Sequence, residues 1–281
     1  MKREALLELA RQAGLARVSP ALEGLMMESI RLKSRPLGEK SSAPGVSKLG
    51  GLPDLPVGTN WPAWKGIPLS FVAQLRLPDV SSYPVARSLP PSGMLYFFYD
   101  ADQQAFGADP SDRDGWKVLY YAGDISHVKQ APALAALPSN SRFRACSLEF
   151  SLEITLPQQP ALYLNGLDWT RDELDLYSDF LFKRVEDRTS ARHRMLGHAD
   201  EIQDDMHLQC QWVSHGVRSS RDPRSSELEK GAMDWQLLLQ VDSDDNNYLH
   251  DQVCGGQMTL QEAQQRIATN WLAVYAGLPS K

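Results

Sequence analysis

The chain has 281 residues, of which 42% are hydrophobic and 23% are charged, a composition typical of a globular protein with a large core. Its 35 acidic and 29 basic side chains give a formal net charge of -6, which argues against a nucleic-acid-binding protein because phosphate recognition usually requires a basic surplus. Three cysteines without a CxxC spacing argue against a disulfide framework and favour a reducing cytoplasm. The sequence also lacks the apolar core of a signal peptide and the roughly 18-residue apolar run of a membrane helix. We therefore expect a cytoplasmic protein that does not associate with membranes.

Two helices are predicted near the N-terminus. Apolar residues recur at helical spacing in residues 3–16. A Ser-Pro pair at 19–20 is typical of an N-cap followed by a first-turn proline, and it predicts a second helix to about Met27. Ile30 and Leu32 either extend this helix or begin a strand.

The middle of the chain is predicted to be rich in strands. Their apolar and aromatic patterns lie at 69–77, 94–100, 116–122, 143–156 (one strand or two) and 235–242. Further helices are predicted at 171–188 and, from a T-x-x-E capping box at Thr259, to about Gly277. Strands in the middle, with helices before, between and after them, predict an α+β fold of antiparallel sheets with flanking helices.

The stretch SKLGGLPDLPVGTNWP at residues 47–62 is predicted to be a rigid structural turn. A phosphate-binding loop would need converging backbone N–H groups, but the prolines remove donors and the GxxxxGK[ST] spacing is absent. Gly50 and Gly51 permit positive φ, and Leu52, Leu55 and Trp61 can hold the loop against a core.

A weak internal repeat relates two parts of the chain. Each copy has a glycine turn, then a strand with one glutamine, which aligns Gln74 with Gln240, and then a glycine-led strand. The identities are few, and chance similarity is the alternative. A true duplication predicts one domain of residues 1–281, with N-terminal helices in 1–36 and repeat halves in 40–165 and 166–281.

Short motifs follow one another along roughly residues 40–250: SKLGGLP at 47–53, Leu55-Pro56, Trp61-Pro62, Ala73-Gln74-Leu75, Gly93, His193, Gly197, IQDDM at 202–206, LLLQ at 237–240 and DSD at 242–244. In order and spacing, the chain resembles the YwqG-like family, a bacterial family long labelled a domain of unknown function. The family usually continues with a Trp-Gly-Asp-x-Gly turn and an aromatic strand. Here only Asp251 matches that turn, and VCGGQM replaces the strand, which puts any ancestral role of the turn in doubt.

The resemblance implies an α+β fold with internal duplication and brings no settled enzymatic activity. Some YwqG-like proteins look like immunity proteins that neutralise toxins, including nucleases, delivered between bacteria by routes such as type VI secretion. Binding of a protein partner is therefore the leading expectation.

The segment HRMLGHADEIQDDMHLQ is the richest in groups that could support chemistry. Its histidines, His193, His198 and His207, lie among carboxylates that zinc or manganese would accept. No HExxH spacing places two imidazoles on one helical face, so a structural turn with an acidic rim is the favoured interpretation. A metal-dependent hydrolase that uses His193, His198 and the acidic segment is the alternative.

Three other features carry weaker signals. DSDDNN at 242–247 matches the first calcium-loop ligands but lacks the required glycine and glutamate. Cys254 lies among carboxylates that would disfavour a thiolate. Gln74 and Gln240 lie in apolar strands, where each is expected to tie its strand to a neighbouring loop; lining a small-molecule cleft is the alternative.

We therefore predict a protein that is not an enzyme, requires no cofactor or metal, and binds and occludes a cognate toxin, such as a secreted nuclease, without binding nucleic acid itself. Acidic clusters would steer it to a basic active site, although solvated faces are the alternative explanation for such clusters. The predicted partner-binding residues are Asp200, Asp204, Asp205, Asp242, Asp244, Asp245, Tyr248 and Asp251. Further acids lie at 172–179, with Trp169, Tyr177 and Trp212 as candidate aromatic contacts.

Overall fold

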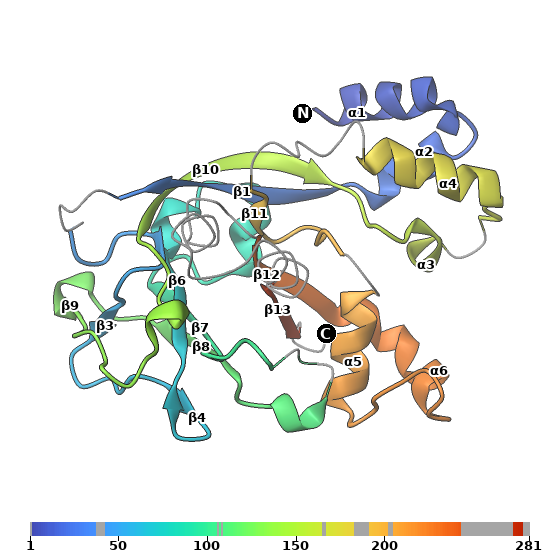
Figure 1. Ribbon diagram of the computed structural model, residues 1–281. Helices are drawn as coiled ribbons and strands as arrows, with labels where there is room; N and C mark the ends of the chain where they lie inside the picture. Colours follow the sequence, from blue (N-terminus) through green and yellow to red (C-terminus); the bar gives the residue numbers. More distant parts are fainter. Residues whose placement is uncertain are drawn as a thin grey trace, which may run out of the picture.

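A nine-stranded antiparallel sheet forms the centre of the protein in the computed structural model, which describes residues 2–37, 43–105, 107, 109–164, 167–182, 191–201, 205–242 and 272–277. The strand order is β13-β12-β11-β1-β10-β2-β6-β7-β8 (Figure 1). Two small two-stranded sheets, β3-β9 and β4-β5, accompany it. The predicted α+β class with antiparallel sheets and flanking helices is confirmed.

The strands of the large sheet are β1 (Met27–Pro36), β2 (Lys48–Leu49), β6 (Ser70–Arg76), β7 (Met94–Tyr99), β8 (Trp116–Tyr121), β10 (Cys146–Thr155), β11 (His193–Met195), β12 (Trp235–Val241) and β13 (Leu272–Gly277). The small sheets contain β3 (Asp54–Pro56), β9 (Val128–Gln130), β4 (Ala63–Trp64) and β5 (Ile67–Pro68). The predicted strands at 69–77, 94–100, 116–122 and 235–242 are confirmed, and the segment 143–156 forms one strand.

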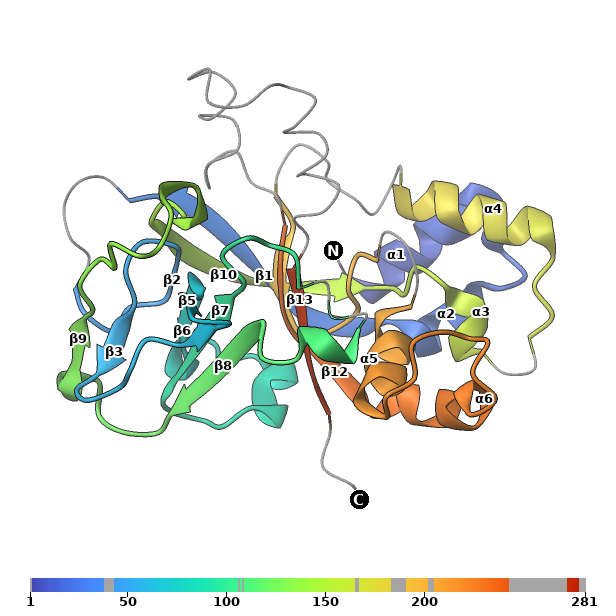
Figure 2. The same cartoon turned by 60° about the horizontal axis from the view of Figure 1, so that its bottom comes forward.

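The helices are α1 (Arg3–Ala10), continued by η1 (Arg11–Leu15), α2 (Ser19–Leu25), α3 (Pro160–Tyr163), α4 (Arg171–Phe180), α5 (Met206–Ser214) and α6 (Ser225–Leu228). Short helical turns are η2 (Leu77–Asp79), η3 (Pro84–Ser88), η4 (Pro110–Asp112), η5 (Ile125–His127), η6 (Ser139–Ser141) and η8 (Glu229–Asp234). Helices α1 to α4 gather at one end of the long β1–β10 pair (Figure 2). Among the described residues, no helix combines the length and the apolar character that a bilayer crossing requires.

The helical end has its own core, which explains why α4 begins at Arg171 as its sequence pattern predicts. The rest of the predicted helix, at 183–188, lies outside the described residues. Thr170 and Glu173 make a reciprocal capping box at its N-terminus. Its inner face buries Tyr177 and Phe180 against apolar residues of α1 and α2, such as Leu6 and Leu22. This burial of apolar surface is what fixes the helix to the rest of the fold.

Strands β1 and β10 pair over ten residues at the middle of the sheet, and each also contacts one of the two flanking halves. Buried Ile30 and Leu32 point to the core, so the ambiguity at these residues is resolved in favour of a strand. The region 1–36 therefore combines helices with strand β1. The division of the remaining chain at 40–165 and 166–281 stays a prediction.

Three local expectations differ from the structure. Helix α2 has Val18 as its N-cap, while Ser19 already lies inside the helix and bonds the Ala16 carbonyl. Residues 272–277 form strand β13, paired with β12, where a helix was predicted to end; residues 259–271 lie outside the described residues. The apolar pattern that predicts a strand at 69–77 is interrupted by a bulge in β6, so Phe71 and Ala73 join different core clusters although they are two residues apart.

Candidate functional site

The first half of the sheet is organised around a buried ion pair. Lys48 on β2 lies opposite Gln74 on β6, and its Nζ is 2.9 Å from Oδ2 of Asp54 at the start of β3. Gln74 joins the pair, because its Nε2 donates to Asp54 Oδ2 (2.6 Å) and its Oε1 accepts from the Asp54 backbone N–H (2.8 Å). The side chains of Lys48 and Asp54 are each 2% exposed. A buried charge needs such compensation, so this arrangement fixes β2, β3 and β6 together.

The turn between Lys48 and Asp54 is structural, as predicted for residues 47–62. Gly50 and Gly51 have φ values of 59° and 73°. A Cβ on Gly50 would lie 2.2 Å from the carbonyl oxygen of Arg144, so the backbone packs too closely for a side chain.

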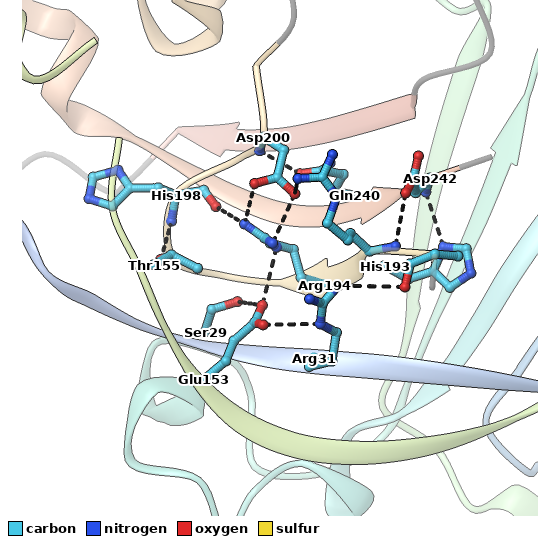
Figure 3. Close-up of polar contacts among 12 residues, drawn as sticks. Ser29, Arg31, Glu153, Thr155, His193, Arg194, His198, Asp200, Gln240 and Asp242 are labelled. Carbon is cyan, nitrogen blue, oxygen red and sulfur yellow. Dashed lines mark hydrogen bonds and ion pairs between the residues drawn. The ribbon is translucent and has the colours of Figure 1, made fainter. Parts of the chain in front are cut away.

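The second half contains a corresponding ion pair (Figure 3). Arg194 on β11 lies opposite Gln240 on β12, and its guanidinium contacts both oxygens of Asp200 at 2.9 Å. The Oε1 of Gln240 accepts from the Asp200 backbone N–H at 3.0 Å, as Gln74 does for Asp54. Both glutamines are fully buried, and each ties its strand to a neighbouring segment earlier in the chain that carries the aspartate, which agrees with the favoured interpretation.

The two halves share more than the ion pair. In each half the cation precedes its aspartate by six residues, and the turn between them contains two successive residues with positive φ. In the second half these are Leu196 and Gly197, at 61° and 69°. In each half, the residue before the cation also accepts a hydrogen bond from the backbone two residues after the glutamine. The Ser47 hydroxyl accepts the Arg76 backbone N–H, and Nδ1 of His193 accepts the Asp242 backbone N–H. This correspondence follows the sequence alignment residue by residue.

The second half extends its polar contacts into the centre of the sheet. Arg194 Nε lies 3.2 Å from Glu153 on β10, which also pairs with Arg31 on β1 at 3.0 Å. A polar cavity of about 40 Å³ lies beside these side chains and Arg192. That volume suits ordered water, whereas small-molecule pockets typically measure about 300–1,000 Å³.

The predicted partner-binding residues fall into three groups. Asp200 and Asp205 are 9% and 5% exposed, and both bond within the chain. Asp242 is half-buried and accepts the Arg192 backbone N–H. Asp204, Asp244, Asp245, Tyr248 and Asp251 lie outside the described residues, as do Cys254 and most of the DSDDNN stretch. The partner-binding role of the set stays a prediction, and Asp200 and Asp205 contribute little exposed surface.

The histidines named for a hydrolase do not form a common site with each other. His193 Nδ1 accepts a backbone N–H, as expected for a structural turn. His198 Nε2 bonds the Leu25 carbonyl at 2.8 Å, and burial lowers the pKa of its ring to about 4. Among the described residues, the group that could hold a metal is instead Glu201, Asp205 and His207.

A family model matches residues 47–256 and describes them as a domain of unknown function (DUF1963). The chain belongs to the DUF1963 family. No curated protein matches the chain. The matched region of this DUF1963 member spans both buried ion pairs, from Lys48–Asp54–Gln74 to Arg194–Asp200–Gln240.

An exposed acidic face lies on α4, which also falls within the matched residues 47–256. Residues 168–182 contain five acidic side chains and one arginine. Asp172, Asp175 and Asp179 lie on the exposed side of the helix at spacings of three and four, and Leu176 between them is 40% exposed. Tyr177, predicted as an aromatic contact for a partner, is 1% exposed and belongs to the core.

Proposed function

We propose that this protein acts by binding another protein, as an immunity protein of the YwqG-like type that covers the active site of a cognate toxin such as a nuclease. The supporting observation is the contrast between buried and exposed polar side chains among the described residues. The ion pairs and His193 and His198 are buried and bonded within the fold, whereas Asp172, Asp175 and Asp179 of α4 are exposed. Exposed charge on a rigid helix favours recognition over chemistry.

The α4 face has the chemistry that a basic partner would recognise. A toxin that grips nucleic acid presents basic groups around its active site. Asp172 and Asp175 can meet such groups, while Leu176 supplies an apolar contact among them. Since Tyr177 and Phe180 lock the opposite side of α4 into a core, the face is held in place before the partner arrives. Preorganisation of this kind reduces the entropic cost of association.

The mechanism proposed is electrostatic steering followed by occlusion. Complementary charge raises association rates by roughly 10–10³-fold, and this gain is lost as salt increases. A stable complex of standard size would bury about 1,600 Å² in total, which is enough to exclude a substrate from a toxin active site.

Charge reversal on α4 provides the test. Asp172→Lys with Asp175→Lys should slow association with the toxin encoded by the neighbouring gene by at least about tenfold at low salt, with a smaller effect on dissociation. Association kinetics of the purified proteins at two salt concentrations would measure this. Glu227→Lys with Glu229→Lys, at exposed positions near α6, makes the same charge change elsewhere as a control.

Two results would count against the proposal. One is failure of the neighbouring gene product to co-purify with this protein. The other is rescue of toxin-expressing cells without any physical complex. Equal slowing by the α4 and control variants would instead show that binding uses another surface.

A further inference from the structure

A compact group of ionisable side chains lies beside the second ion pair, where the N-terminus of α5 meets the end of α3. Asp205 is the N-cap of α5, and His207 lies in its first turn. The His207 Nδ1 is 4.0 Å from Glu201 Oε1 and 4.0 Å from Asp205 Oδ1. The hydroxyl of Tyr163, at the end of α3, lies 2.8 Å from Asp205 Oδ2 and 3.0 Å from His207 Nδ1.

The Glu201 carboxylate is the observation that points to a ligand. Its side chain is 4% exposed, and Oε1 accepts the Met206 backbone N–H at 2.8 Å. Its other oxygen, Oε2, is buried without a hydrogen-bond partner among the described residues. Among the described residues, no arginine or lysine forms an ion pair with Glu201, whereas Asp54 pairs with Lys48 and Asp200 pairs with Arg194. An uncompensated buried carboxylate beside a second one is costly unless a proton or cation joins it.

We propose that Glu201, Asp205 and His207 form a binding site for a divalent transition-metal ion of the zinc or manganese class. One imidazole with two carboxylates is a donor set that these ions accept. The three ligand atoms lie within 4.8 Å of one another. Ligands about 2.1 Å from a tetrahedral ion stand roughly 3.4 Å apart, so modest side-chain rotations would complete the coordination.

The surrounding contacts suit such a site. Asp205 Oδ1 accepts the Leu208 backbone N–H as the helix cap, and Asp205 Oδ2 accepts the Tyr163 hydroxyl. Tyr163 would then orient the carboxylate from outside the coordination sphere.

Burial, and after it the Asp205 carboxylate, raises the pKa of Glu201 to about 8, so a metal ion would compete with a proton for this carboxylate.

Metal binding by the tag-free protein would test the site. Calorimetric titration with Zn²⁺ and separately with Mn²⁺ should reveal one site per chain. Glu201→Gln should weaken it by at least about tenfold, since even outer-shell changes cost 10–100-fold. His207→Ala should do the same. Matched controls are Glu227→Gln and His215→Ala, at exposed positions, and both should bind as the unmodified protein does.

The Glu201→Gln variant is expected to fold, because an amide has the shape of the protonated acid, and circular dichroism would confirm this. Absence of stoichiometric Zn²⁺ or Mn²⁺ binding would overturn the proposal and mean that the carboxylates are stabilised by shared protons instead. Equal affinity in Glu201→Gln and Glu227→Gln would also overturn it. The outcome is independent of the proposed immunity function, which is read out by the toxin complex.

Discussion

Replacing Lys48 with methionine is expected to destabilise the fold by about 3–5 kcal/mol, because removal of one member of a buried ion pair leaves the other charge uncompensated. Asp54 would keep its bonds from Gln74 and from the Gly45 backbone N–H, but would lose its only cationic partner among the described residues. Methionine has a similar length and apolar stem, so little packing should be lost. Urea unfolding at neutral pH would measure the change.

The appropriate control is an ion pair of the same kind on the surface. Arg35 and Glu149 pair across β1 and β10 with side chains 61% and 55% exposed, so Arg35→Met should cost no more than about 1 kcal/mol. Adding Asp54→Asn to Lys48→Met should recover much of the stability, because no unpaired charge then remains buried. If Lys48→Met costs no more than Arg35→Met, the buried pair does not stabilise the sheet as inferred.

The equivalent change in the second half, Arg194→Met, would reveal a difference between the two ion pairs. Arg194 serves two carboxylates, Asp200 and Glu153, whereas Lys48 serves Asp54. Arg31 also pairs with Glu153, and Arg192 also pairs with Asp200, so the charge of the second half is shared among three arginines. Removal of Arg194 leaves each carboxylate one cation, whereas removal of Lys48 leaves Asp54 none among the described residues, so Arg194→Met should destabilise the fold less than Lys48→Met.

The sequence predicts the framework better than the site. Gln74 and Gln240 could be aligned and given their role from the sequence, because an amide in an apolar strand must find a hydrogen-bond partner. Lys48 was missed as a core residue. Its partners lie 6 and 26 residues away, and nothing in the local pattern distinguishes a buried lysine from a solvated one. The alignment of Lys48 with Arg194, each six residues before an aspartate, was the available signal.

Two acidic residues are buried although the sequence predicts that they are exposed. Asp200 and Asp205 belong to a run that sequence reasoning places on the surface, yet each is buried by contacts with a distant element. Asp205 meets Tyr163 of α3, some forty residues earlier in the chain. Strand β13 was missed for a related reason, since the pairing of 272–277 with β12 outweighs local helix preference. Long-range pairing is not visible in a short window of sequence.

Acid is expected to destabilise the protein through His198. Its Nε2–H donates to the Leu25 carbonyl in a buried setting, and burial lowers the ring pKa from 6.5 to about 4. The unfolded chain therefore binds the proton more readily than the folded one, so stability is full above pH 6.5 and falls as the pH drops toward 4. At about 1.36 kcal/mol per pH unit, this one group should remove about 3 kcal/mol between pH 7 and pH 4.

Two measurements check this expectation. The His198 ring resonances should titrate near pH 4 in the folded protein by NMR. His198→Gln retains a donor for the Leu25 carbonyl but cannot gain a proton, so its stability should fall by about 3 kcal/mol less than that of the unmodified protein over the same pH range. Parallel stability curves for the two proteins would mean that His198 is either hydrated or charged in the native state. Its hydrogen bond to α2 would then not be what holds the helical end against the second half of the sheet.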